Sequence, residues 1–72
     1  MKIKITKDMR DRLIDLAASG PLLHKNIDME LKALGLIQNY DGFAYYVEIT
    51  QEASKNLYDD SGRINKINFE VL

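Results

Sequence analysis

The spacing of apolar residues changes several times along this 72-residue chain, and each change predicts a new element. Ile3 and Ile5 alternate with lysines, which is the period of a short strand with one solvent-facing side. Apolar residues then recur at helical spacing, which predicts a helix over residues 7–19 with Thr6 as its N-cap. Gly20-Pro21 ends this helix, because glycine suits the left-handed position after a helix and proline cannot continue it. The apolar stripe consists of Met9, Leu13, Leu16 and Ala17.

A brief connector over residues 22–26, long enough for one helical turn, leads to a second predicted helix over residues 26–34. Gly35 stands where a helix-ending glycine belongs, and Leu36 is placed for the apolar contact of that motif. In this helix Ile27, Leu31 and Leu34 are expected to face inward, and Asp28, Met29 and Lys32 to face more outward.

Asp41-Gly42 lies between two strand-like runs, residues 36–39 and 44–49, and this arrangement predicts a β-hairpin. In the second run Tyr45, Val47 and Ile49 share one face, on which Tyr45 is expected to pack inward, while Tyr46 and Glu48 share the other.

Three further elements are expected after the hairpin. Thr50 caps a last helix that runs to about residue 58, residues 59–62 form a turn, and Ile67, Phe69 and Val71 alternate as in a strand. The two terminal strands could pair with each other or lengthen the hairpin. A free strand edge could also join a second copy, which would make a homodimer.

Composition places these elements in one small domain, residues 1–72. Cysteine is absent, which excludes disulfide-rich folds and thiolate-bound zinc and fits the reducing cytoplasm. No apolar run approaches the roughly 20 residues of a membrane span. Ten Lys and Arg against 11 Asp and Glu give a net charge of -1, whereas a DNA-binding domain is normally basic.

The order of elements resembles that of small winged helix-turn-helix domains, such as those common in phage and prophage proteins. The matching residues are Leu13, Leu16-Ala17, Gly20-Pro21-Leu22, Ile27, the run from Leu31 to Ile37, Tyr46, Thr50, Ala53 and Leu57. The resemblance implies a compact α+β winged helix with about three helices, a β-hairpin wing and short terminal strands. It also implies a small DNA-binding protein that resembles transcription regulators.

The DNA-binding hypothesis assigns one set of residues to the duplex. The second predicted helix would read the major groove, where Asn pairs with adenine and Lys reaches guanine or phosphate. The wing tip, residues 39–42, would lie along the backbone or minor groove. The base-reading and wing residues are Lys25, Asn26, Met29, Lys32 and Asn39; the expected phosphate contacts are Lys2, Lys4, Lys7, Arg10 and Arg12. If the chain does not bind DNA, these basic side chains form a solvated face and pair locally with Asp8, Asp11 and Asp15.

The alternative hypothesis is a non-catalytic protein-interaction module, an adaptor or inhibitor for which a phage genome is one source. It rests on the near-neutral charge and on a Tyr-rich wing, because tyrosine is enriched at protein interfaces. Its expected contact residues are Tyr40, Phe43 and Tyr46. The single histidine, His24, has no partner at catalytic or metal-ligand spacing, so we expect no enzyme, cofactor or metal site.

Overall fold

Two small sheets and three helices build the described part of the chain, which covers residues 2–72 of this computed structural model. The α+β class expected from the sequence is confirmed. In chain order the elements are β1 (Ile3–Ile5), α1 (Lys7–Ser19), β2 (Leu22–Leu23), α2 (Asp28–Ala33), β3 (Ile37–Asn39), a 3-10 turn (Tyr40–Gly42), β4 (Tyr46–Ile49), α3 (Gln51–Leu57) and β5 (Phe69–Val71). None of the helices within residues 2–72 combines the length and apolar character that a membrane crossing requires.

The larger sheet is antiparallel, with strand order β2-β4-β3. β3 and β4 form the expected hairpin, in which Ile37 pairs with Ile49. The expected connector after α1 is partly a strand, because Leu22 pairs with Val47 along the other edge of β4. This pairing satisfies backbone groups of β4 on that edge and turns Leu22 toward the same face as the buried Val47.

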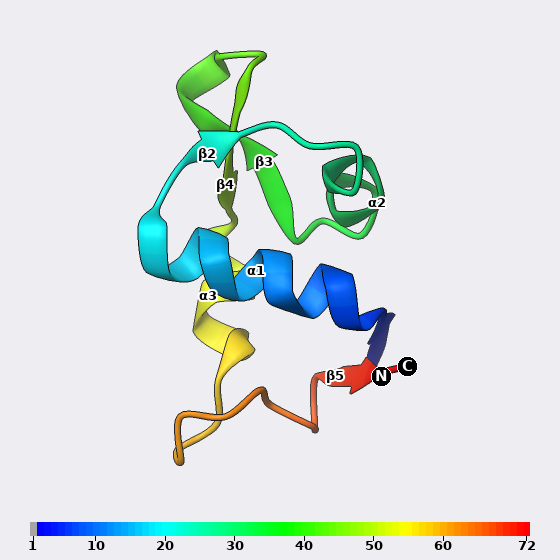
Figure 1. The fold of residues 1–72 in the computed structure, drawn as a ribbon. Helices are drawn as coiled ribbons and strands as arrows, with labels where there is room; N and C mark the ends of the chain where they lie inside the picture. Colours follow the sequence, from blue (N-terminus) through cyan, green and yellow to red (C-terminus); the bar gives the residue numbers. More distant parts are fainter. Residues whose placement is uncertain (1) are drawn as a thin grey trace.

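The smaller sheet joins the two ends of the chain. β1 and β5 pair in parallel, with Ile3 opposite Phe69, and the two termini lie side by side (Figure 1). Of the two arrangements open from the sequence, the terminal strands therefore pair with each other. Two parallel strands need a long connection between them, and here all the elements between β1 and β5 form that connection.

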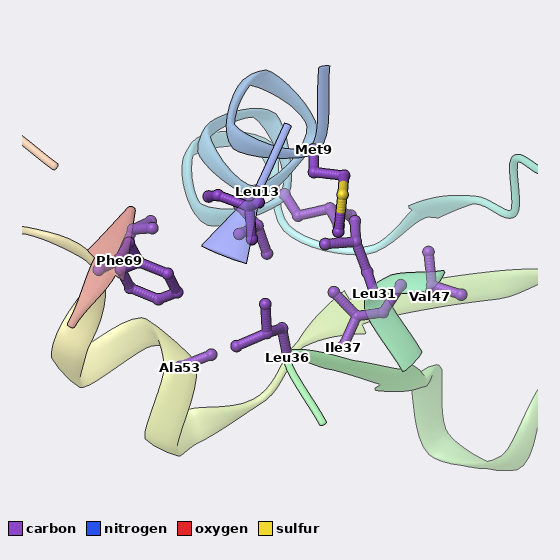
Figure 2. Packing of buried hydrophobic residues seen from close by; sticks show 11 residues of the cluster. Met9, Leu13, Leu31, Leu36, Ile37, Val47, Ala53 and Phe69 are labelled. Atoms are coloured by element: carbon purple, nitrogen blue, oxygen red, sulfur yellow. The ribbon is translucent and has the colours of Figure 1, made fainter. Parts of the chain in front are cut away.

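The core packs against one face of α1, the face that carries Met9, Leu13 and Leu16. In Figure 1, α1 crosses the middle of the molecule, with the hairpin and α2 on one side and α3 and the terminal strands on the other. Figure 2 shows Met9 and Leu13 of α1 pointing toward side chains from α2, the hairpin, α3 and β5. The buried apolar residues are Ile5, Met9, Leu13, Leu16, Leu31, Leu36, Ile37, Val47, Ala53, Leu57 and Phe69.

The predicted helix caps are confirmed. Thr6 Oγ1 accepts a hydrogen bond from Met9 N (3.2 Å), and Thr50 Oγ1 accepts one from Ala53 N (3.2 Å). Gly35, at φ +75°, ends α2 in a Schellman motif, in which Leu36 N donates to Leu31 O (3.0 Å). Leu31 and Leu36 are both buried, so the motif also makes the expected apolar contact.

Two expectations for α2 and one for the C-terminal strand were wrong. α2 begins at Asp28 instead of residue 26. The residues before it form a turn, in which Asp28 N donates to Lys25 O, three residues earlier (2.9 Å). Leu34, expected to face inward, is exposed at the C-cap. Ile67 is 80% exposed because the strand starts only at Phe69, after a turn in which Asn65 Oδ1 accepts a hydrogen bond from Ile67 N.

Candidate functional site

The hairpin ends in a tight turn at Asp41-Gly42. Asp41 (φ 44°, ψ 37°) and Gly42 (φ 79°) both have positive φ, and Phe43 N donates to Tyr40 O at 2.8 Å. These are the features of the mirror-image turn that Asp-Gly favours. The loop continues through residues 43–45 before β4 begins, so the tip is wider than a two-residue hairpin. The extra residues place several aromatic side chains together.

Three aromatic residues of this loop surround one shallow apolar pocket of about 280 Å³. Tyr40 enters the turn, Phe43 leaves it and Tyr46 starts β4; Pro21, from the end of α1, completes the lining. All three aromatic side chains are exposed, and Phe43 is 58% exposed. These four residues, which we call the aromatic tip, thus include all three residues that the sequence suggested for protein contact.

Further apolar surface adjoins the aromatic tip. Tyr46 and Pro21 also line a second hollow, of about 420 Å³, together with Leu23 of β2. Leu23 pairs with Tyr46 across the sheet, and both side chains are exposed. Contiguous exposed apolar surface of this kind is uncommon on a small domain and marks contact sites for other molecules.

Tyr45 was expected to pack inward beside Val47, and this prediction was wrong. Its side chain is 77% exposed. β4 begins only at Tyr46, so the alternation of the strand does not extend to Tyr45, which lies in the preceding turn. The backbone of Tyr45 is nevertheless held, because its carbonyl accepts a hydrogen bond from His24 N (2.8 Å).

A buried ion pair fixes α2 against α1. Arg12 donates from Nε to Asp28 Oδ1 (3.0 Å) and from Nη2 to Asp28 Oδ2 (2.9 Å). The same Arg12 Nη2 reaches Leu23 O (2.7 Å), and Lys25 N donates to Asp28 Oδ2 (2.8 Å). Burial by itself raises the pKa of Asp28, but hydrogen bonds from Arg12 and Lys25 N and the charge of Arg12 hold that pKa below its ordinary value.

This ion pair corrects two expectations from the sequence. Arg12 was expected to pair with Asp8 or to contact phosphate, and Asp28 was expected to face outward. Both side chains are buried, and Asp28 is fully so. Because the guanidinium and the carboxylate satisfy each other, Arg12 is not available to an external phosphate.

The residues suggested for base reading are only partly gathered on α2. Lys25 and Asn26 are exposed in the turn before α2, and Met29 is 66% exposed in its first turn. Lys32 is half-buried, and Asn39 lies apart from the others, exposed at the end of β3 opposite Val47. Glu30 adds an exposed acidic side chain to the same short helix.

The hairpin carries no basic residue. From Ile37 to Ile49 its charged residues are Asp41 and Glu48, and Gln38 Nε2 donates to Glu48 Oε2 across the strands (3.1 Å). A wing that tracks a phosphate backbone needs positive charge, because phosphate neutralisation supplies most non-specific affinity for DNA. The hairpin therefore lacks the positive charge that contact with a phosphate backbone needs.

No cluster suited to a metal ion was found within residues 2–72, where His, Cys, Asp and Glu side chains do not gather in threes. His24 is half-buried in the segment between β2 and α2. Pro21 and Leu23 are the members of the apolar surface that sequence reasoning missed. The strand pairing of residues 22–23 with β4 brings them beside the hairpin, and the sequence offers no local signal for that pairing.

Comparisons with protein-family models, with curated proteins and with solved structures find no match to this chain.

Proposed function

We propose that this chain is a non-catalytic protein-binding module that uses the aromatic tip as its contact surface. One observation carries the proposal: Tyr40, Phe43 and Tyr46 are exposed together around one apolar pocket with Pro21. Aromatic side chains supply much of the binding energy at protein interfaces, at a low cost in side-chain entropy. We also propose a cytoplasmic location, which the absence of cysteine from the sequence fits.

The frame of the module supports a winged-helix type of fold. α1, β2, α2, β3 and β4 follow one another, and β2 pairs beside the β3–β4 hairpin, which corresponds to the wing. A single short helix, α2, lies between β2 and β3, where a helix-turn-helix has two helices. The sheet and the wing of such a fold are therefore present, whereas only one of the two helices of the helix-turn-helix is.

DNA recognition through α2 and the wing is the second candidate. The observation in its favour is that Lys25, Asn26 and Met29 are exposed next to one another at the start of α2. Against it stand the acidic side chains of the wing and of Glu30. If it is correct, replacing Lys25 and Lys32 by serine abolishes binding to a random duplex in a fluorescence anisotropy titration.

The first prediction tests the aromatic tip by site-specific photo-crosslinking. A photoreactive phenylalanine analogue at Tyr45, beside the tip, should form an adduct with a discrete protein in cells that naturally contain this chain. The same analogue at Ile67, which is equally exposed, is the matched control and should not form that adduct. An adduct with a second copy of the chain would identify self-association as the form of binding.

The second prediction is that binding of the crosslinked partner depends on the aromatic tip. With the purified partner, Phe43→Ser should weaken binding by about thirtyfold or more, because truncating a central aromatic anchor typically costs about 2 kcal/mol or more. Ile67→Ser removes a comparably exposed apolar side chain from another part of the molecule and should leave binding unchanged. Equal binding by wild type and Phe43→Ser would contradict the proposed function.

A further inference from the structure

A third hollow, lined mainly by charged side chains, lies near the paired strands β1 and β5. Its volume is about 460 Å³, and four basic side chains surround it with one acidic side chain. We call this hollow the basic pocket. Its basic residues are Lys2, Arg10, Arg63 and Lys66, its acidic residue is Glu70, and Ile64, Phe69 and Val71 supply its apolar lining.

The fold brings these charges together from distant parts of the sequence. Lys2 directly precedes β1, Arg10 lies on α1, and Arg63 and Lys66 belong to the segment between α3 and β5. The parallel pairing of β1 with β5 joins the two ends. Asp59 N donates to Arg63 O (2.7 Å), and a strand-like bridge between residues 58 and 64 holds that segment in place.

The basic charges in this pocket are largely unneutralised. Within residues 2–72, Lys2, Arg63 and Lys66 make no ion pair, whereas Arg10 is paired with Asp11 (2.9 Å). Asp59 lies outside the pocket lining. The Ser61 hydroxyl and the N–H groups of Arg63 and Ser61, with a smaller contribution from the charge of Lys66, hold the pKa of Asp59 below its ordinary value.

Such a concentration of positive charge is unexpected in a chain whose net charge is -1. Three of the basic side chains, Lys2, Arg63 and Lys66, make no ion pair within residues 2–72 and repel one another, and a concave surface focuses their field on the space between them. An anion in that space would relieve the repulsion. Arginine presents a planar fork that matches two oxygens of one phosphate, while lysine acts as a point charge.

We propose that the basic pocket binds a phosphate group. The phosphate belongs either to a small phosphorylated ligand or to the backbone of a nucleic acid, because the recognising chemistry is the same. This site is distinct from α2 and the hairpin, because none of its lining residues belongs to either. It does not depend on the proposed function of the aromatic tip.

The test is an NMR titration of the whole ¹⁵N-labelled chain with pyrophosphate at low ionic strength. The amide signals of residues 63–71 should shift and saturate, and those of residues 40–46 should not. The double variant Arg63→Ala/Lys66→Ala should bind about tenfold more weakly or worse, because hydrogen bonds between charged groups carry most of the affinity. Both side chains are exposed, so the variant should keep the dispersed spectrum of the fold.

A matched control distinguishes the loss of the pocket side chains from a mere change in the net charge of the protein. Lys25→Ala/Lys55→Ala removes the same charge from two exposed positions outside the pocket. In a repeat titration at about 0.1 M salt, where charges are screened beyond about 10 Å, this control should change the dissociation constant by less than about twofold. Glu70→Gln removes the one carboxylate of the lining and should tighten binding. The proposal is overturned if the two double variants lose affinity equally, if Glu70→Gln does not tighten binding, or if no saturable shift is seen.

A labelled random DNA duplex, followed by fluorescence anisotropy, distinguishes the two sources of phosphate. Duplex binding that disappears in Arg63→Ala/Lys66→Ala identifies a nucleic-acid backbone as the ligand. Pyrophosphate binding without duplex binding identifies a small phosphorylated ligand. Duplex binding that depends on Lys25 and Lys32 but persists in the pocket variant would contradict a nucleic-acid role for the basic pocket.

Discussion

Arg10 and Arg12 lie two residues apart on α1, yet their surroundings differ completely. Arg10 pairs with its neighbour Asp11 at the surface, where water and salt weaken the attraction. Arg12 turns toward α2 and is buried with Asp28, where its guanidinium holds both carboxylate oxygens. A buried charge without its partner is strongly destabilising, so the two ion pairs should differ greatly in their effect on unfolding.

We predict that Arg12→Met or Asp28→Asn lowers the free energy of unfolding by about 3–5 kcal/mol, which is most of the stability of so small a domain. Arg10→Met is the matched control and should cost less than about 1 kcal/mol. Urea unfolding followed by circular dichroism measures these differences. The Arg12→Met/Asp28→Asn double variant should lose less than the sum of the single losses, since neither partner is then left charged and buried. Similar losses for the variants at positions 10 and 12 would disprove this account.

At the scale of elements, Thr50 connects three of them. Its side chain caps α3, and its Oγ1 also lies within hydrogen-bonding distance of Gly35 O and Leu36 O (both 3.2 Å). Its backbone N–H donates to Leu36 O at 2.9 Å. Thr50 therefore fixes the start of α3 to the end of α2 and the beginning of β3, in addition to starting a helix.

We predict that Thr50→Ala destabilises the fold by about 1–2 kcal/mol, at the upper end of the range for an N-cap, because the contact with the end of α2 is lost as well. Thr50→Ser keeps the hydroxyl and should restore most of the loss. Ser54→Ala, at an exposed position inside α3, should have almost no effect or a small stabilising one. Thermal unfolding of the three variants measures the series. A loss in Thr50→Ser as large as in Thr50→Ala would show that the hydroxyl is not responsible.

At the scale of the whole molecule, the pairing of β1 with β5 closes the domain. It places Phe69 against the core beside residues of α1 and α3, as Figure 2 shows, and it assembles the basic pocket from both ends of the chain. The aromatic tip lies on the other side of α1. The two surfaces share no lining residue, so changes at one should leave binding at the other unaltered.

We predict that Phe69→Ala lowers the free energy of unfolding by about 3–5 kcal/mol, as expected when a large core side chain is removed. Ile67→Ala, two residues earlier in the same alternation, should cost less than about 0.5 kcal/mol because its side chain is almost fully exposed. Urea unfolding under identical conditions compares the two. Equal losses would mean that the C-terminal strand does not contribute to the core in the way that the β1–β5 register requires.

Local signals in the sequence were sufficient for the elements whose formation depends on neighbouring residues. Thr6 and Thr50 cap their helices, and Gly20 and Gly35 follow the ends of theirs. In the apolar stripe of α1, Met9, Leu13 and Leu16 are buried as their spacing predicts, and Ala17 is half-buried. The turn that carries the aromatic tip could also be predicted from the sequence, because Asp41-Gly42 favours it. In each case the cause lies within a few residues of its effect.

Contacts between distant residues were decided only by the tertiary structure. The alternation of Ile67, Phe69 and Val71 does not reveal that the strand begins at Phe69 or that its partner is β1. Three further contacts join positions that are separated along the chain. Arg12 pairs with Asp28, Pro21 lies beside the other residues of the aromatic tip, and Lys2 and Arg63 line the same pocket. Packing of the whole chain determines such neighbours. A buried charge needs an opposite charge and a strand edge needs hydrogen-bond partners, but any residue that the fold brings near can supply them.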